Sequence, residues 1–180
     1  MDPWRARSSI REKRPIMAIG APEPSAGLRS LWRRLASTPT RTFVIYPLCV
    51  VAFELALYGR LSFVPWGTLL LVWGYAQYRL VGNYRQRRGG GGPGISVPPR
   101  RIVTEGPYRY VRNPMYLGHL IFLLGLAVTF WSVLAAALFV LNVVWFHRRV
   151  VDDEARLRKT FGDQYVDYQA RVKRWIPGVL

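Results

Sequence analysis

The feature that most constrains the fold is a nearly continuous apolar stretch over residues 115–147. As a single helix it would be about 50 Å long, whereas the hydrocarbon core of a bilayer is about 30 Å thick. The stretch must therefore fold back on itself. The sequence TFWS at 129–132 is the expected turn, which predicts one membrane span over about 115–129 and a second over about 132–147.

Two further apolar stretches, 42–58 and 61–82, come earlier in the chain and predict two more spans. Although 51% of the residues are apolar, the net charge is +16. The apolar residues and the basic residues occupy separate blocks of the sequence. Such segregation is typical of multispanning membrane proteins. The expected fold class is all-α: an integral membrane helical bundle of about four transmembrane helices, plus a cytosolic amphipathic C-terminal helix.

The distribution of basic residues predicts the topology. Nine Lys or Arg residues precede the first span, one separates the first span from the second, eight lie in the middle connection together with Arg79 at the end of the second span, none lies in the turn, and eight follow the fourth. Basic residues concentrate on the cytoplasmic side, so both termini are expected there. The usage of arginine and alanine, without an organelle signal, suggests a bacterial inner membrane.

Composition also excludes some functions. One cysteine, Cys49, and two histidines, His119 and His147, do not make a metal centre, and we expect no metal. The positive charge is assigned to topology and to membrane lipid head groups, because no motif for binding nucleic acid is visible. The sequence GGGGPG at 89–94 lacks the Gly-Lys-Ser/Thr of a phosphate-binding loop and is interpreted as a flexible linker.

The two ends of the chain differ in character. Residues 1–40 predict a disordered basic tail with a possible interfacial helix at 28–37, which leaves 41–180 as the membrane domain. The C-terminal segment is amphipathic, with apolar or aromatic residues three and four apart, namely Leu157, Phe161, Tyr165, Tyr168, Val172 and Trp175. Gly162 is expected to weaken or interrupt this helix, Pro177 to end it, and the helix to pack against the cytosolic ends of the spans.

The segment GPYRYVRNPMYLG at 106–118 leads into the third span. Asn113 is suited to cap a helix and Pro114 to begin it. The surrounding aromatic and basic residues are denser than a cap needs, and part of the cluster is equally explained as a belt at the lipid head groups. Further along, Gly118 and Gly125 share one helix face and predict close helix approach.

A second polar segment, HRRVVDDEARL at 147–157, places Asp152, Asp153 and Glu154 shortly after a basic pair, with two valines between them. Ion pairs with Arg148 and Arg149, one helical turn away, are one explanation for these acids. Three adjacent carboxylates at the cytosolic exit of a span in so basic a chain also predict a pocket for a cationic group.

Together, the two segments and the sequence FGDQYVDYQARVKRWIP at 161–177 resemble the isoprenylcysteine carboxyl methyltransferase and phospholipid methyltransferase superfamily, over about residues 100–177. This resemblance implies an integral membrane enzyme that uses S-adenosylmethionine to methylate a lipid or a lipid-like acceptor, such as an isoprenoid, a carboxylate or an amine. The cofactor would bind within 100–177.

The resemblance also implies site residues. Arg149 would lie near the methyl acceptor. The cofactor would be bound by the following residues: Arg100, Arg101, Ile102, Val103, Tyr108, Asn113, Pro114, Met115, Tyr116, Asp153 and Glu154. Asn113 stands where carboxyl methyltransferases have histidine, as in the Asn-Pro-Met-Tyr of phospholipid-type members, and Asp153 stands in place of glutamate. The cofactor is therefore implied more directly than the acceptor.

Two other functions compete with methyl transfer. Membrane sterol-type reductases, which use NADPH, carry a similar sequence at the start of the third span, and a non-catalytic relative would keep the same fold. Two polar residues inside predicted spans are separate candidates. Glu54 is costly in lipid, which makes it a functional candidate unless it is partly solvated near Arg60, and His119 either replaces the motif histidine or packs between helices.

Overall fold

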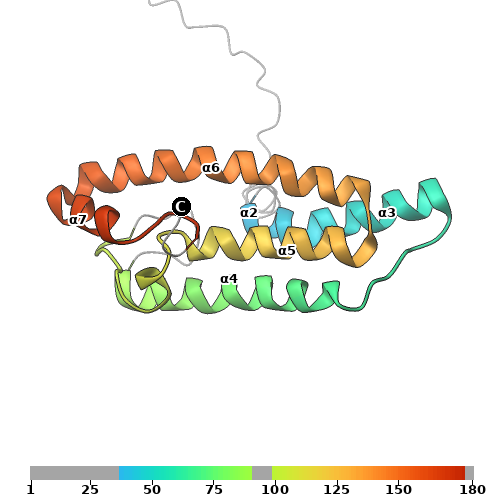
Figure 1. The fold of residues 1–180 in the computed structure, drawn as a ribbon, viewed down its shortest axis with the longest axis horizontal. Coiled ribbons are helices and arrows are strands. Elements are labelled where there is room, and N and C mark those ends of the chain that lie inside the picture. The colour runs from blue at the N-terminus through green and yellow to red at the C-terminus, as the bar shows by residue number, and fades with distance from the viewer. Residues whose placement is uncertain (1–36, 91–98, 177–180) are drawn as a thin grey trace, which may run out of the picture.

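The computed structural model describes residues 37–90 and 99–176, which form helices arranged along one common axis (Figure 1). The elements in chain order are α2 (Thr38–Thr40), η1 (Arg41–Ile45), α3 (Tyr46–Tyr58), α4 (Gly67–Gly89), η2 (Gly106–Arg109), α5 (Pro114–Phe130), α6 (Val133–Phe161) and α7 (Asp163–Arg171). The first three run on as one rod, in which η1 is a π-helical turn. The predicted all-α class is confirmed.

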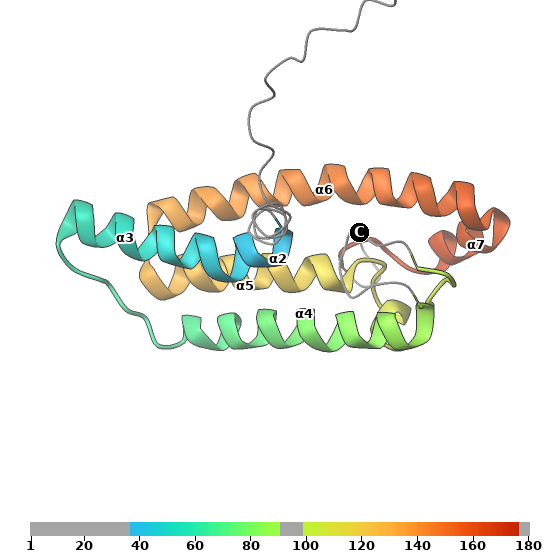
Figure 2. The ribbon, with the colours of Figure 1, turned by 180° about the vertical axis from the view of Figure 1, so that it is seen from behind.

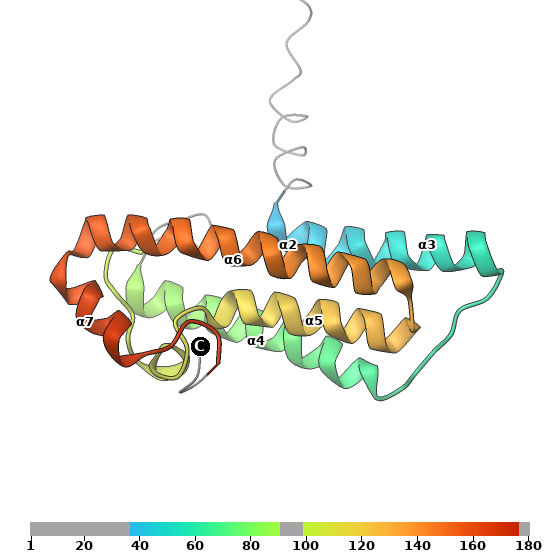
Figure 3. The same ribbon diagram turned by 45° about the horizontal axis from the view of Figure 1, so that its top comes forward.

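Helix α5 is the centre of the bundle. It lies between α4 and α6 and contacts both, while α3 packs against α6 and η1 against α5 (Figures 1 and 2). The turns at 59–66 and 131–132 lie at one end of the molecule, and η2, α7 and the C-terminal segment lie at the other (Figure 3). Residues far apart in sequence therefore meet at the α7 end.

Glycines let α4 and α5 approach each other closely, as Gly118 and Gly125 predicted. A Cβ placed on Gly74 would lie 2.5 Å from the backbone nitrogen of Phe122, and one on Gly118 would lie 2.9 Å from the carbonyl oxygen of Gly74. On α4, Gly67 meets Thr129 in the same way. The pairing fixes the register of α5 against α4.

Two stretches of helix within the described residues are long and apolar enough to cross a membrane: Thr38–Tyr58 and Val133–Phe161. Helix α5 is apolar but shorter. Many of the large apolar side chains on α3, α4 and α6 are exposed on the outside of the bundle, as expected for helices in lipid.

Two helices extend beyond the predicted limits. Helix α4 was expected to end near residue 82 but continues to Gly89, because 83–88 contains good helix formers and its last turn carries Arg87 and Arg88, which the helix dipole favours. Helix α6 was expected to end near residue 147, yet it runs on to Phe161. No proline or glycine interrupts it before Gly162, whose φ of 56° ends the helix.

The amphipathic C-terminal segment packs as predicted, but it is divided. Gly162 separates the end of α6 from α7, and α7 ends at Arg171 rather than near Pro177. Its aromatic face is buried in a cluster formed by Tyr165, Tyr168 and Val172. Residues 1–36 of the predicted tail, and with them nearly all of the predicted interfacial helix at 28–37, lie outside the described residues, whereas residues 38–40 begin the first rod. Of the linker predicted at 89–94, Gly89 is the last residue of α4 and Gly90 follows it, while 91–94 lie outside the described residues, as does Pro177.

Candidate functional site

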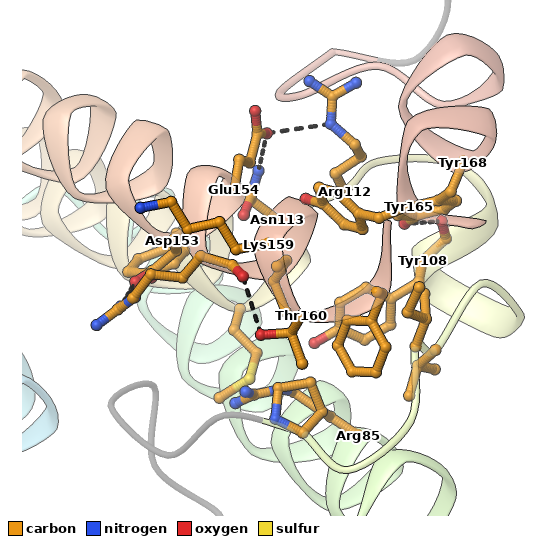
Figure 4. A pocket seen from close by; sticks show the side chains of 18 residues that line it. Arg85, Tyr108, Arg112, Asn113, Asp153, Glu154, Lys159, Thr160, Tyr165 and Tyr168 are labelled. Carbon is orange, nitrogen blue, oxygen red and sulfur yellow. Dashed lines mark hydrogen bonds and ion pairs between the residues drawn. The ribbon is translucent and has the colours of Figure 1, made fainter. Parts of the chain in front are cut away.

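A cavity of about 400 Å³ lies at the α7 end of the bundle (Figure 4). Its lining comes from one arginine of α4, the connection into α5, the start of α5, the last turns of α6, and α7: Arg85, Pro99, Ile102, Val103, Tyr108, Arg112, Asn113, Met115, Tyr116, Asp153, Glu154, Arg156, Leu157, Lys159, Thr160, Phe161, Tyr165 and Tyr168. The size is within the usual range for small-molecule sites. The extended α6 and the break at Gly162 build this cavity, because they turn α7 back over it.

The structure brings most of the predicted cofactor residues into this cavity. Those that line it are Ile102, Val103, Tyr108, Asn113, Met115, Tyr116, Asp153 and Glu154. Arg100 and Arg101 do not line it; their backbone N–H groups donate to the carbonyl of Gly89, at 2.8 and 3.0 Å, and so attach the connection to the end of α4. Pro114 also lies outside, with its carbonyl accepting from Gln77 Nε2 at 2.9 Å.

Asn113 occupies the N-cap position of α5, as predicted, but its side chain does not cap the helix. The amide nitrogen instead donates, at 3.5 Å each, to Glu154 Oε1 and to the carbonyl of Arg174. Asn113 therefore connects the start of α5 to the end of α6 and to the C-terminal segment. The amide is thereby turned toward a buried carboxylate, which is a strong hydrogen-bond acceptor, and not toward the first turn of α5.

Glu154 is held by two arginines. Arg112 Nε donates to Oε1 at 3.1 Å, Arg174 donates to both oxygens at 3.1 and 2.7 Å, and Gln169 Nε2 donates to Oε2 at 3.2 Å. Burial alone would raise the pKa of this carboxyl, but the hydrogen bonds and charges of Arg174 and Arg112 outweigh it and hold the pKa below the usual value. Glu154 thus links α6 to the connection before α5 and to the C-terminal segment, and its negative charge is already balanced by Arg112 and Arg174.

Asp153 has a different environment, although it is the next residue. Its carboxylate accepts a hydrogen bond from the Tyr116 hydroxyl and forms an ion pair with Arg156, three residues ahead. The Asp153 side chain is 16% exposed, compared with 5% for Glu154, and the side chain of Arg156 is 66% exposed. An exposed arginine can move aside, so Asp153 is the carboxylate in this cavity that is suited to bind a ligand cation.

Three tyrosines form the wall on the α7 side. The Tyr168 hydroxyl donates to the carbonyl of Tyr108 at 2.7 Å, which attaches α7 to η2 (Figure 4). Burial raises the pKa of Tyr108 to about 12 and that of Tyr165 to about 12, and it also raises the pKa of Tyr168. These rings therefore stay neutral at physiological pH, and they give the cavity an apolar face.

The cavity also contains basic side chains that the sequence analysis did not assign to it. Arg85 reaches it from α4, while Arg156 and Lys159 reach it from α6. Because the second span was predicted to end at residue 82, Arg85 was expected in a polar connection and not on a particular face of a helix. The periodicity of a helix continued to residue 89 would have placed Arg85 one turn beyond Val81, which is buried against Tyr108.

Arg149 does not line the cavity but contacts Tyr116, which does. Its Nε donates to the Tyr116 hydroxyl at 3.3 Å, and its guanidinium carbon is 5.8 Å from the centre of the Trp145 ring. A second arginine, Arg41 of η1, lies 5.3 Å from the centre of the same ring. Its Nε is buried and has no hydrogen-bond partner among the described residues. Sequence reasoning missed Arg41, which joins the first rod to this cluster.

His119 and Glu54 lie elsewhere. The His119 ring is fully buried between Phe43, Tyr78 and Phe146, with centroid distances of 4.8, 4.7 and 5.4 Å, and it does not line the cavity. The ring therefore packs between helices, outside the cavity that the predicted cofactor residues line. Glu54 is buried in α3, away from the cavity, and its Oε1 has no partner in the described part of the chain.

Comparison with known proteins agrees with this arrangement. The family model described as phospholipid methyltransferase matches residues 61–164, which is more than half of the chain. The chain belongs to this family. The matched segment starts before α4 and includes α5 and α6, together with every cavity residue except those of α7. This family match does not favour the reductase alternative.

Several curated relatives match a shorter part of this phospholipid methyltransferase family member. Protein-S-isoprenylcysteine O-methyltransferase of Schizosaccharomyces pombe is 40% identical over 78 residues, which are 42% of this chain and 33% of the relative. The B form from Arabidopsis thaliana is 40% identical over 81 residues, 44% of this chain and 41% of the relative. The mouse protein is 32% identical over 77 residues. The aligned part of the chain thus covers well under half of the first relatives.

Proposed function

We propose that the chain is an S-adenosylmethionine-dependent methyltransferase of the membrane, transferring a methyl group to a lipid or lipid-like acceptor. The observation that carries the proposal is the cavity at the α7 end, which combines a carboxylate, basic side chains and neutral aromatic walls in one space. Membership of the phospholipid methyltransferase family and the relatives named protein-S-isoprenylcysteine O-methyltransferase support it.

The residues of the cavity fit each polar group of this cofactor. Asp153 can receive the ammonium group through a charge-assisted hydrogen bond, and Arg85 or Lys159 can receive the carboxylate. Ile102 and Tyr108 offer apolar and aromatic surface to the adenine. When bound, the cofactor would supply an activated methyl group. The chain itself would align the acceptor and exclude water, so proximity and orientation would account for most of the rate.

The acceptor would approach from the membrane side, past Tyr116 and Trp145. Arg149 and Arg41 stand there and would attract the polar end of the acceptor, most directly a carboxylate or a phosphate. A carboxylate acceptor needs no base, whereas an amine acceptor must first lose a proton. A prenylated carboxylate, of the kind that the relatives' names indicate, is accordingly the first acceptor to assay.

In this proposal the bundle has four spans, with both termini and the cavity on the cytoplasmic side of a bacterial inner membrane. The basic residues support the arrangement, because the α7 end of the described structure carries Arg85, Arg100, Arg101, Arg109 and Lys159, whereas Arg60 is the basic residue of the turns at the opposite end. A cofactor made in the cytosol would then reach the cavity directly.

Binding of S-adenosylhomocysteine tests the proposal by isothermal titration of the purified chain in detergent. Asp153→Asn keeps the shape of the side chain but removes its charge, and should weaken binding by tenfold or more, as expected for the loss of a charge-assisted hydrogen bond. Asp152→Asn, at the exposed neighbouring position, is the matched control and should bind as the wild type does. Glu154 is a poor position for this test, because its loss would loosen the walls of the cavity.

Two results would count against the proposal. One is no detectable binding of S-adenosylhomocysteine to folded wild-type protein, and the other is equal binding by the Asp153→Asn variant. Transfer of a labelled methyl group to lipid extracts would then identify the acceptor, and its absence from every extract would favour a non-catalytic relative.

A further inference from the structure

A second cavity, of about 540 Å³, lies between α5 and α6. Its α5 side is formed by Leu117, Leu120, Ile121 and Leu124, whose spacing puts them on one helical face. That face differs from the one on which Gly118 and Gly125 meet α4. The cavity is therefore a groove on the outside of the bundle, and Leu124 in it is 39% exposed.

The α6 side of the groove is apolar along most of its length and basic at one end. Phe139, Val143 and Val144 continue the apolar surface, and His147 and Arg148 follow at the end nearer α7. Both of these basic residues are exposed. From Phe139 to Arg148 the helix rises by about 13 Å, so the groove runs from the interior of an expected span to the level of the lipid head groups.

The groove is distinct from the first cavity. Among the described residues the two share no lining side chain. A buried cluster of Tyr116, Phe146 and Val150 stands between them, and Phe146 and Val150 are fully buried. A molecule in the groove therefore does not occupy the space proposed for the methyl donor and acceptor.

The C-terminal segment lines the basic end of the groove. Trp175 and Ile176 line it there, and Trp175 also packs against the buried cluster of Tyr116, Phe146 and Val150. Arg174, the preceding residue, holds Glu154 on the other side of the segment. The same short stretch of chain thus lines the groove and holds Glu154, which lines the first cavity.

We propose that this groove binds an anionic phospholipid, with an acyl chain along the apolar walls and the phosphate held by Arg148 and His147. Charge complementarity selects this occupant, because a guanidinium and an imidazole at head-group level favour a phosphate without a compensating ammonium group. The apolar walls, about 10 Å long from Leu117 to Leu124, would hold the first part of an acyl chain that lies parallel to the helices. The proposal does not depend on the methyltransferase function.

The lipid would also stabilise the first cavity. By packing against Trp175 and Ile176, it holds in place the segment from which Arg174 reaches Glu154. Binding of S-adenosylhomocysteine and of the anionic lipid should therefore strengthen each other, since coupling between two sites is reciprocal.

Native mass spectrometry of the full chain, titrated with phosphatidylglycerol or phosphatidylcholine, tests the binding. The wild type should prefer phosphatidylglycerol by about tenfold. Arg148→Gln should weaken that binding by about fivefold, as expected for one basic residue near the head groups. Val144→Trp, which fills the groove but keeps every charge, should weaken binding of both lipids. Arg79→Gln, at an exposed site on α4, removes the same charge and should bind as the wild type does.

The outcomes separate specific binding from general attraction. Equal losses in Arg148→Gln and Arg79→Gln would mean that only the overall charge matters, and would overturn the proposal. Undiminished binding in Val144→Trp, or occupation of the groove by a second copy of the chain in cross-linking, would also overturn it. Failure of S-adenosylhomocysteine to bind in discs of equimolar phosphatidylglycerol and phosphatidylcholine would contradict the proposed function and the coupling. The lipid titration would still decide whether the groove binds an anionic phospholipid.

Discussion

At the scale of single residues, Glu154 and Asp153 show how adjacent carboxylates take different roles. A step of one position on α6 turns the side chain by about 100°, so Glu154 points to the connection and C-terminal segment while Asp153 meets Tyr116. Glu154 is surrounded by donors that satisfy both oxygens. Asp153 keeps an exposed arginine as its counter-ion, which leaves it suited to exchange that partner for a ligand.

Removing Glu154 should therefore destabilise the protein more than removing any neighbouring acid. Glu154→Ala leaves Arg112, whose side chain is 10% exposed, and Arg174 without their shared carboxylate, and should lower the free energy of unfolding by about 3 kcal/mol. Unfolding in mixed micelles measures it. Asp152→Ala is the control and should change the free energy by less than about 0.5 kcal/mol. Similar losses in the two variants would show that Glu154 contributes little.

The pH dependence of stability follows from the same carboxylate. The folded-state pKa of Glu154 is below its ordinary value, so its contribution is fully present above about pH 4.5 and is lost as the pH falls through the folded-state value. The difference in Tm between wild type and Glu154→Gln should thus be large at neutral pH and shrink on acidification. A difference that stays constant through this range would mean that Glu154 is not ionised in the fold.

At the scale of helices, the close packing of α4 on α5 sets the frame for both cavities. Gly74→Val should lower the free energy of unfolding by about 2–3 kcal/mol, because its Cβ would collide with backbone atoms of α5, which cannot move as a side chain does. Ala137→Val, on the exposed surface of α6, adds methyl groups without a clash and should change stability little. Equal stability of the two variants would argue against the α4–α5 contact.

Helices were predictable from the sequence where apolar length decides them, and less so where polar residues continue them. The start of α5 at Pro114 and the break at Gly162 follow from local preferences of proline and glycine. The ends of α4 and α6 did not, because basic and acidic helix formers continue a helix beyond the apolar part that a bilayer requires.

Contacts across the chain were the other part that sequence could not supply. The hydrogen bond from Arg112 to Glu154 joins residues 42 positions apart. The cation–π contacts bring Arg41 and Arg149 to the ring of Trp145. Family resemblance pointed to several cavity residues, but it did not separate Asp153 from Glu154. Only the directions of the two side chains in the folded chain show that Asp153 is suited to bind a ligand and that Glu154 links segments of the structure.

At the scale of the whole molecule, the two ends of the bundle should face opposite sides of the membrane. The proposed cytoplasmic end has η2 and α7, and the other end has the turns at 59–66 and 131–132 (Figure 1). Cysteine labelling can test this, since Cys49 is the single native cysteine and Cys49→Ser gives a cysteine-free background.

In that background, Ser62→Cys and Trp131→Cys should react with a membrane-impermeant maleimide on spheroplasts. Arg109→Cys and Asp163→Cys should react only after the membrane is opened. Ser62 precedes α4 and Trp131 is 76% exposed in the turn after α5, so both thiols would be accessible from the outer side. Each of the four tests a different connection of the bundle. Labelling of Arg109→Cys on intact spheroplasts would place the first cavity outside, where a cytosolic cofactor cannot reach it, and would contradict both the topology and the proposed function.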